Sequence, residues 1–218
     1  DEVWEEFHKW AQSAEYRHES GIELPISLLG VDIGYRTDQA SRFVQKSRKY
    51  VAHKGSNRRG LPLVPRRPSK TTRYKVPFYE LGVDTGKDLL TSWLTVQKPG
   101  PRCAHWHMGY DYEYFRMLCA ERPKKEKNKK TGKIETIWAL RDGFQRNEAL
   151  DIRVGNMAIR QILNPNYDRL HKQIMIDAAR MRDEEKADEV EVHETPMEQI
   201  IKKRRAGGKS SFATGWRR

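Results

Sequence analysis

The chain has 218 residues, which suits one domain, or one domain with a tail, and is long enough to bury a hydrophobic core. Its formal net charge is +12, with 42 Lys and Arg against 30 Asp and Glu, so we expect a polyanionic partner. No apolar stretch approaches the ~18 residues of a membrane span and no signal-like segment opens the chain, which favours a soluble protein with no membrane partner.

The first elements predicted are a helix and a buried strand. Apolar residues at helical spacing between Val3 and Ala14 predict an amphipathic helix. The apolar run Ile26–Val31 then ends in one acid, Asp32, and in Gly34, which frees the backbone to turn. Ligands of open α/β sheets bind outside the carboxyl ends of the strands, so Asp32 is a candidate catalytic acid. The alternative is that Asp32 only caps the turn.

A strongly basic segment follows, from Arg36 to Lys75. It holds thirteen Lys and Arg and a single acid, Asp38. Within it we expect a short helix capped by Thr37 and a strand over Lys49–Gly55. Such a segment suits contacts with phosphates, and a solvated, partly disordered loop is the alternative. The DNA-binding candidates in it are Arg36, Lys54, Arg58 and Arg59.

The next strand and helix are predicted over Val76–Val83 and Thr85–Val96. The glycines and Lys87 between them look like half of a phosphate loop, but no Ser or Thr follows the lysine, which excludes a Walker nucleotide site. If the strands are parallel neighbours, Lys87 faces the same sheet edge as Asp32 and could contact a phosphate. The alternative is that it pairs with Asp84.

Alternation over Cys103–His107 predicts a fourth strand. His105 and His107 have the spacing of a two-histidine metal arm, but no third ligand lies nearby, so we favour a packing or DNA-facing pair over a zinc site. Cys103 and Cys119 form no C-x-x-C pair and lie in apolar contexts, which favours reduced core residues over a disulfide.

The segment Lys124–Lys133 is predicted to be a basic hairpin arm. It holds six lysines and one glutamate around a Thr-Gly turn, and the apolar stretch Ile134–Leu140 follows it. We therefore expect Lys129 and Lys130 to bind DNA, together with Lys87.

Two helices and a tail end the chain. Glu148 and Asp151 share a face in the first turn of a helix, with Asn147 as N-cap. They are candidates for chemistry, although they could only complement the helix dipole. A second helix is predicted over residues 168–182. We expect one domain over residues 1–180 and a charged, flexible tail over residues 181–218, acidic first and then basic.

A family resemblance is carried by stretches spread in order over about residues 1–163. These are Leu24-Pro-Ile-Ser-Leu-Leu-Gly-Val-Asp-Ile-Gly-Tyr-Arg-Thr37, Lys54-Gly55, Gly82-Val-Asp-Thr-Gly-Lys-Asp88, Tyr114-Phe115, Ala120-Glu121, Trp138 and Arg146-Asn-Glu-Ala-Leu-Asp151. Together they resemble the large terminase subunit of lambda-like tailed phages. The most specific parts are the stretches that contain Asp32 and Glu148.

The resemblance implies an α/β endonuclease domain of ribonuclease H-like fold, with a mixed sheet flanked by helices, that cuts concatemeric viral DNA during packaging. In that family, acids from a first strand, a later strand and a C-terminal helix hold two divalent metals. Asp32 would be the later-strand acid. Glu148 and Asp151 are both candidates for the helix acid, with Glu148 favoured and Asp151 as its supporting partner.

Two departures from the family pattern affect these expectations. The family's first strand precedes a helix like the one at residues 1–19, so that strand and its acid are expected to be missing here. Gly155-Asn156 stands where a bulkier continuation is expected. The implied partners are double-stranded DNA, the terminase small subunit and the portal or procapsid, in the host cytoplasm during phage assembly.

The chemistry of the residues fits a nuclease independently of the resemblance. Phosphodiester hydrolysis needs a metal to activate water and to hold the leaving oxygen, and Mg²⁺ or Mn²⁺ prefers carboxylate oxygens. The basic stretches would bind the DNA backbone without reading its sequence. The main alternative is a non-catalytic DNA-gripping or procapsid-contacting module, and an integrase or resolvase of the same fold is a further one.

Overall fold

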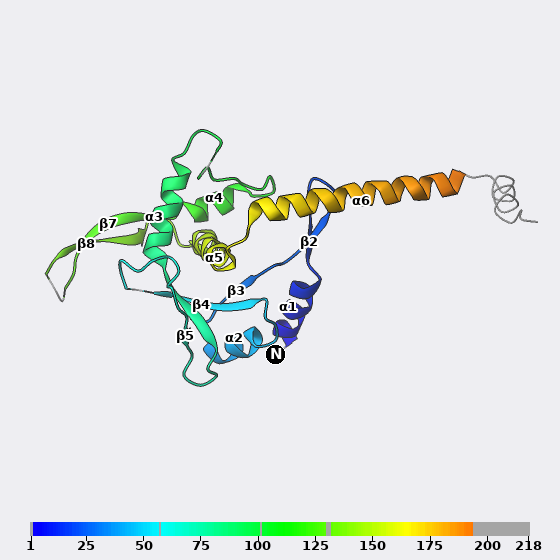
Figure 1. The fold of residues 1–218 in the computed structure, drawn as a ribbon. Helices are drawn as coiled ribbons and strands as arrows, with labels where there is room; N and C mark the ends of the chain where they lie inside the picture. The colour runs from blue at the N-terminus through cyan, green and yellow to red at the C-terminus, as the bar shows by residue number, and fades with distance from the viewer. Residues whose placement is uncertain (1, 57, 101, 130–131, 194–218) are drawn as a thin grey trace, which may run out of the picture. The chain divides into compact units, whose positions relative to one another are not determined.

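The computed structural model describes residues 2–56, 58–100, 102–129 and 132–193 of the chain (Figure 1). The helices within them are α1 (Glu2–Ser13), α2 (Thr37–Val44), α3 (Val83–Leu94), α4 (Tyr112–Leu118), α5 (Glu148–Leu163) and α6 (Tyr167–His193). The strands are β1 (Glu15–Arg17), β2 (Glu23–Pro25), β3 (Leu29–Asp32), β4 (Tyr50–Ser56), β5 (Ser69–Lys70), β6 (Pro77–Gly82), β7 (Glu121–Lys127) and β8 (Ile134–Leu140). No helix in these ranges combines the length and the apolar character that a membrane crossing requires.

The chain divides into two compact units. The sheet unit comprises Asp1–Glu15 and Pro25–Pro165, and the helix unit comprises Tyr16–Leu24 and Asn166–Arg218. In the helix unit, α6 continues past residue 180 as far as His193, so the first part of the expected tail is helical. Residues 194–218 of that tail lie outside the described residues. All candidate site residues belong to the sheet unit.

The centre of the sheet unit is a four-stranded mixed sheet of order β3-β4-β6-β5. β3, β4 and β6 are parallel neighbours, and β5 pairs antiparallel with β6. The register places Asp32 beside His53 and Lys54 beside Glu80. The carboxyl ends of the three parallel strands therefore share one edge of the sheet. The predicted α/β class, with a mixed sheet and flanking helices, is confirmed.

Different helices cover the two faces of this sheet, because side chains alternate along each strand. Val31 points to the face covered by α1 and α2, where Phe43 stacks on Tyr50 with ring centroids 4.7 Å apart. Gly30 points to α5, and the two backbones approach so closely that a Cβ at residue 30 would lie 2.6 Å from Cγ1 of Ile159. The core on this second side includes Leu63, Leu81, Leu90, Leu118, Leu150 and Val154.

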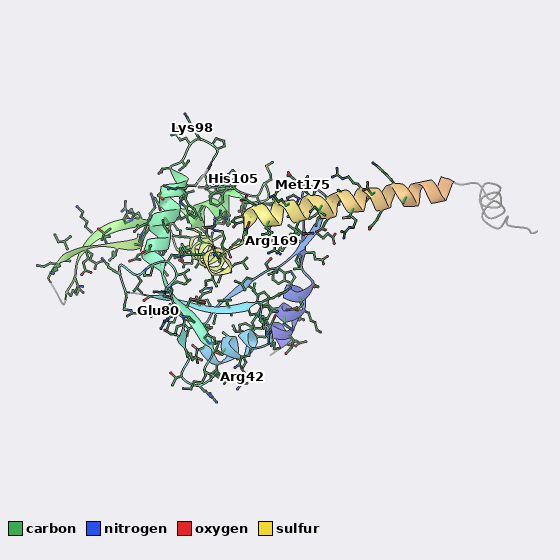
Figure 2. The ribbon with its side chains drawn as sticks, in the orientation of Figure 1. Arg42, Glu80, Lys98, His105, Arg169 and Met175 are labelled. Carbon is green, nitrogen blue, oxygen red and sulfur yellow. The ribbon has the colours of Figure 1, made fainter. Side chains whose placement is uncertain are left out.

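Two expectations for the middle of the chain are wrong. Cys103–His107 is irregular and not a strand (Figure 2 labels His105 in it). Its alternating pattern comes from one packed side chain, Trp106. The Arg153 guanidinium lies over the Trp106 ring, 4.7 Å from the ring centroid. Both cysteines are free, as expected, but Cys119 follows α4 and is exposed, so it is not a core residue.

The predicted basic hairpin is confirmed. β7 and β8 pair antiparallel over their full lengths, from Glu121 opposite Leu140 to Lys127 opposite Ile134. Lys130 lies outside the described residues. The exposed lysines among the described residues of this hairpin are Lys124, Lys125, Lys127, Lys129 and Lys133.

Candidate functional site

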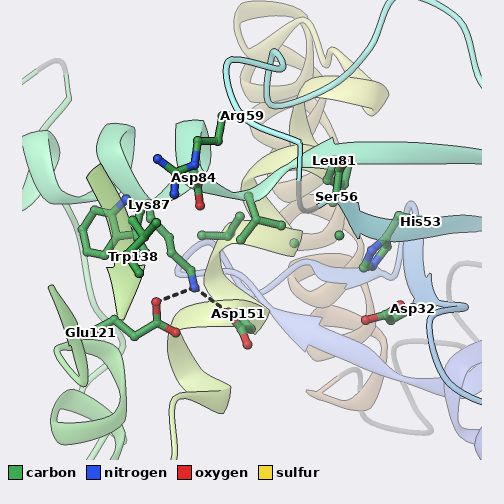
Figure 3. Close-up of a pocket in the computed structure, with 15 residues that line it drawn as sticks. Asp32, His53, Ser56, Arg59, Leu81, Asp84, Lys87, Glu121, Trp138 and Asp151 are labelled. Carbon is green, nitrogen blue, oxygen red and sulfur yellow. Dashed lines mark hydrogen bonds and ion pairs between the residues drawn. The ribbon is translucent and has the colours of Figure 1, made fainter. Parts of the chain in front are cut away.

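The three parallel strands end at a pocket of about 430 Å³ (Figure 3). Its walls come from β3, β4, β6, α3, α5 and the β7–β8 hairpin, all within the sheet unit. A ligand that enters it meets the last residues of several strands at once, as is usual in open α/β sheets. The polar and ionisable side chains in its lining are Asp32, His53, Ser56, Arg59, Asp84, Lys87, Glu121 and Asp151.

Asp32 and His53 form one end of the pocket. Asp32 is the last residue of β3, and its Oδ1 accepts a hydrogen bond of 2.7 Å from the Gly34 amide. His53 is its register neighbour on β4. Burial lowers the pKa of His53, although the Asp32 charge acts in the opposite direction. A neutral imidazole beside a carboxylate is a pair of donors that a divalent ion can use.

Gly155 of α5 keeps the space beside the His53 ring open. A Cβ at residue 155 would lie 3.7 Å from Cε1 and 3.8 Å from Nε2 of His53, which is ordinary van der Waals contact. Any larger side chain would therefore reach into the space next to these ring atoms. Sequence analysis singled out Gly155 as a departure from the family pattern, and it missed His53, whose only signal was a polar residue inside an apolar strand.

Lys87, Glu121 and Asp151 form the other end of the pocket. The Lys87 Nζ donates to Glu121 Oε2 at 2.7 Å and lies 3.4 Å from Asp151 Oδ1. Lys87 is 6% exposed and Glu121 is 9% exposed, so this ion pair is buried. Burial raises the pKa of Asp151, while Lys87 opposes that change. The sequence-based alternative that Lys87 pairs with Asp84 is wrong.

Asn147, at the N-cap position of α5, binds two of the carboxylates that line this end of the pocket. Its side chain makes no capping hydrogen bond to the helix. Instead, Nδ2 donates to Glu121 Oε1 at 2.5 Å and to Asp151 Oδ2 at 3.1 Å. Both oxygens of Glu121 are therefore engaged. Sequence reasoning identified Asn147 only as a cap, because its true partner lies on a strand that no local pattern connects to it.

The structure places the two candidate helix acids differently. Asp151 lines the pocket together with Asp32, whereas Glu148 is not among the lining residues. Glu148 is exposed and accepts a hydrogen bond of 3.1 Å from Arg146 Nε. Its pKa is lowered by its own backbone N–H and by Arg146.

The side chains of the pocket suit a hard divalent ion in chemical type. Four carboxylates and one imidazole line it, and carboxylate oxygen is the preferred ligand of Mg²⁺ and Mn²⁺. Within the described ranges, however, no three or more His, Cys, Asp or Glu side chains are grouped so that they alone could hold a metal ion. A magnesium ion often has only one or two carboxylate ligands and completes its shell with water and substrate phosphate oxygens.

The basic residues proposed to bind DNA differ in whether they already form ion pairs or ring contacts within the protein. Arg58 donates to Glu80 Oε2 at 2.7 Å, and Arg59 lines the pocket and lies 3.4 Å from Glu135. Arg36 lies next to the Tyr35 ring. Lys87 is buried in its ion pair, so of the pocket cations only Arg59 is exposed. The other exposed candidates are Arg36, Lys54, Arg58 and Lys129.

Comparison with known proteins agrees with the resemblance. A model of the family described as the terminase large subunit gpA endonuclease domain matches residues 1–173. No curated protein and no solved structure matches the chain. The matched residues include every element from α1 to α5 and every residue of the pocket, so the resemblance predicted over residues 1–163 is confirmed. The chain belongs to the family of terminase large subunit gpA endonuclease domains.

Proposed function

We propose that this chain is a metal-dependent DNA endonuclease that cuts concatemeric viral DNA during genome packaging, with the pocket at the sheet edge as its catalytic site. The observation that carries the proposal is the position of Asp32. It ends β3, the parallel strand at one edge of the described sheet, at the rim of a polar pocket, in a chain of the terminase endonuclease family. Its carboxylate, with His53 beside it, would hold Mg²⁺ or Mn²⁺.

The residues around Asp32 prepare it for this role. The Gly34 amide fixes the carboxylate through Oδ1, and Oδ2 has no hydrogen-bond partner among the described residues. The bound metal would activate a water and stabilise the charge on the scissile phosphate. Arg59, in the pocket wall, supplies a positive charge for a neighbouring phosphate. The exposed lysines of the hairpin and Lys54 would hold the DNA backbone on either side.

The finer features of this assignment are also proposals. We infer a ribonuclease H-like fold, which the family membership and the mixed sheet with its parallel centre support. We further propose that the protein works in the host cytoplasm during phage assembly, with double-stranded DNA, the terminase small subunit and the portal or procapsid as partners. Family membership supports this setting, since terminases act in DNA packaging.

Cleavage of linear duplex DNA in Mg²⁺ or Mn²⁺ tests the proposal. Asp32→Asn keeps the size and hydrogen bonding of the side chain but removes its charge, so it should abolish cleavage and leave folding nearly unchanged. Asp38→Asn is the matched control, because Asp38 is exposed and pairs with Arg73 away from the pocket.

Two results would count against the proposed nuclease. Wild-type cleavage rates in Asp32→Asn would exclude Asp32 from the catalytic site. A wild-type protein that binds DNA but cuts it with neither metal would instead favour the non-catalytic DNA-gripping module, which the hairpin lysines would also serve.

A further inference from the structure

One end of the pocket already holds a positive charge. The Lys87 ammonium lies between two carboxylate oxygens, 2.7 Å from Glu121 Oε2 and 3.4 Å from Asp151 Oδ1 (Figure 3). The three side chains come from α3, β7 and α5, so the ammonium sits where separate elements converge. Two carboxylates that converge on one cation form the arrangement that a divalent ion would otherwise need.

The surroundings hold this ammonium firmly in place. Lys87 and Glu121 are both buried, and a buried charge is stable only with its partner. Asn147 donates to the remaining oxygen of each carboxylate, at 2.5 Å for Glu121 and 3.1 Å for Asp151. A metal ion at this end would have to displace the lysine and leave its charge buried without a partner, which is unfavourable.

The opposite end of the pocket has donors but no cation. Asp32 accepts one hydrogen bond, from the Gly34 amide. The His53 ring makes no hydrogen bond to any described residue, and Gly155 leaves the space beside its Nε2 open. The two ends therefore differ: one has carboxylates bound to a lysine, and the other has a carboxylate and an imidazole that remain available.

We propose that Lys87 is a built-in cation that takes the place of a second divalent ion, so that the pocket binds one metal ion, at Asp32 and His53. The number of metals rests on the nuclease function proposed above, but the role of Lys87 at Glu121 and Asp151 does not. Lys87 is then a positioning residue that keeps Glu121 and Asp151 in place and gives the pocket wall a fixed positive charge. The family resemblance alone implies two divalent metals.

The number of bound Mn²⁺ ions tests this inference, because Mn²⁺ can be counted directly by electron paramagnetic resonance during a titration of metal-free protein. The wild type should bind one ion. Lys87→Ala should bind two, because it frees Glu121 Oε2 and Asp151 Oδ1, which need to move by only about 1 Å to reach metal–oxygen distances. Lys87→Arg keeps the charge and is the matched control, with one ion expected.

Further variants locate each ion. Adding Glu121→Gln to Lys87→Ala should remove the second ion and leave the first, whereas Asp32→Asn should remove the first ion from the wild type. If Lys87→Ala does not fold without metal, Lys87→Gln provides a second test, since its amide can still donate to Glu121. The melting temperature of Lys87→Gln should then rise more on addition of Mn²⁺ than that of the wild type.

The outcomes separate this inference from the proposed function. Two ions in the wild type, or one ion in both the wild type and Lys87→Ala, would overturn the role of Lys87 while leaving a metal-dependent nuclease intact. No ion in the wild type and one in Lys87→Ala would overturn the metal at Asp32 but support the role of Lys87. No ion in either protein would overturn both.

Discussion

Glu80 on β6 binds one of the DNA-binding candidates, Arg58. Its pKa is lowered by the Ser56 hydroxyl, which donates to Oε1 at 2.7 Å, and by the Arg58 guanidinium, which donates to Oε2 at 2.7 Å. Arg58 can therefore contact a DNA phosphate only if its guanidinium leaves Glu80 or divides its N–H donors between Glu80 and the phosphate. The strength of this pairing can be measured through the titration of Glu80.

We predict that Ser56→Ala raises the pKa of Glu80 toward 4.5, its usual value. A carboxylate with a lowered pKa in the folded state contributes stability above its unfolded pKa, and this is lost as the pH falls through the folded value. The variant should therefore show a weaker fall in the free energy of unfolding below about pH 4.5. An NMR titration of Glu80 measures the pKa, with Ser69→Ala on β5 as the control, and an unchanged pKa would contradict the prediction.

Gly30 allows β3 and α5 to approach each other. A Cβ at residue 30 would lie 2.6 Å from Cγ1 and 2.8 Å from Cδ1 of Ile159, so the Ile159 side chain or a backbone segment would have to move. We predict that Gly30→Ala lowers the free energy of unfolding by about 1–3 kcal/mol, as overpacked cores do. In an Ile159→Ala background the same change should have little effect. Urea unfolding of all four proteins measures this coupling, and additive losses would argue against the contact.

At the scale of residues, the sequence predicts an acid at a strand end better than it predicts the partners of that acid. Asp32 follows an apolar run and Asp151 shares a helix face with Glu148, and both Asp32 and Asp151 line the pocket. Glu148 was favoured over Asp151 on its match to the family, yet it lies outside the lining. His53 has only a weak local signal, a polar residue inside an apolar strand, and the partners of Glu121 are distant from it in the chain.

The basic hairpin is the element best placed to hold DNA outside the pocket. We predict that a variant with four lysines changed to Gln has a weaker salt dependence of DNA binding; the lysines are Lys124, Lys125, Lys127 and Lys129. The slope of the logarithm of the binding constant against the logarithm of the salt concentration should become less negative by about 0.9 per lost phosphate contact. The effect should be the same for any DNA sequence, because phosphate contacts carry no sequence information. Binding measured over a range of salt concentrations, with Lys9→Gln on α1 as the control, tests this prediction. An unchanged slope would mean that the hairpin lysines face solvent and do not contact the DNA.

At the scale of elements, periodicity predicts most helices and strands but not the irregular segments. The hairpin was predictable because the apolar stretch Ile134–Leu140 follows a lysine-rich arm with a Thr-Gly turn, and α5 because Asn147 can cap a helix whose first turn holds two acids. The prediction of a strand over Cys103–His107 was wrong because the alternating pattern there comes from one packed tryptophan, Trp106. A short alternating stretch becomes a strand only if a partner strand is available, and that depends on the tertiary fold.

For the whole molecule, a metal at the pocket should increase stability. We predict that Mn²⁺ at about 100 times its dissociation constant stabilises the protein by about 2.7 kcal/mol, because only the folded pocket brings its ligands together. Asp32→Asn should remove most of this gain. Glu148→Gln should keep it, since Glu148 lies outside the pocket lining and pairs with Arg146. Thermal unfolding of the three proteins with and without Mn²⁺ measures the stabilisation by the metal. If Glu148→Gln removes that stabilisation, Glu148 is the metal ligand after all.

The position of Glu121 at the root of the hairpin has a mechanical consequence. Glu121 begins β7 and is bound to Lys87, while the exposed lysines lie further along the same strand. The two strands are joined by the turn beyond Lys127 and Ile134, so a force on DNA held by those lysines would be carried along both strands to the root of the hairpin. There it would reach Glu121 and its ion pair with Lys87. A load on the DNA would therefore act directly on one wall of the pocket.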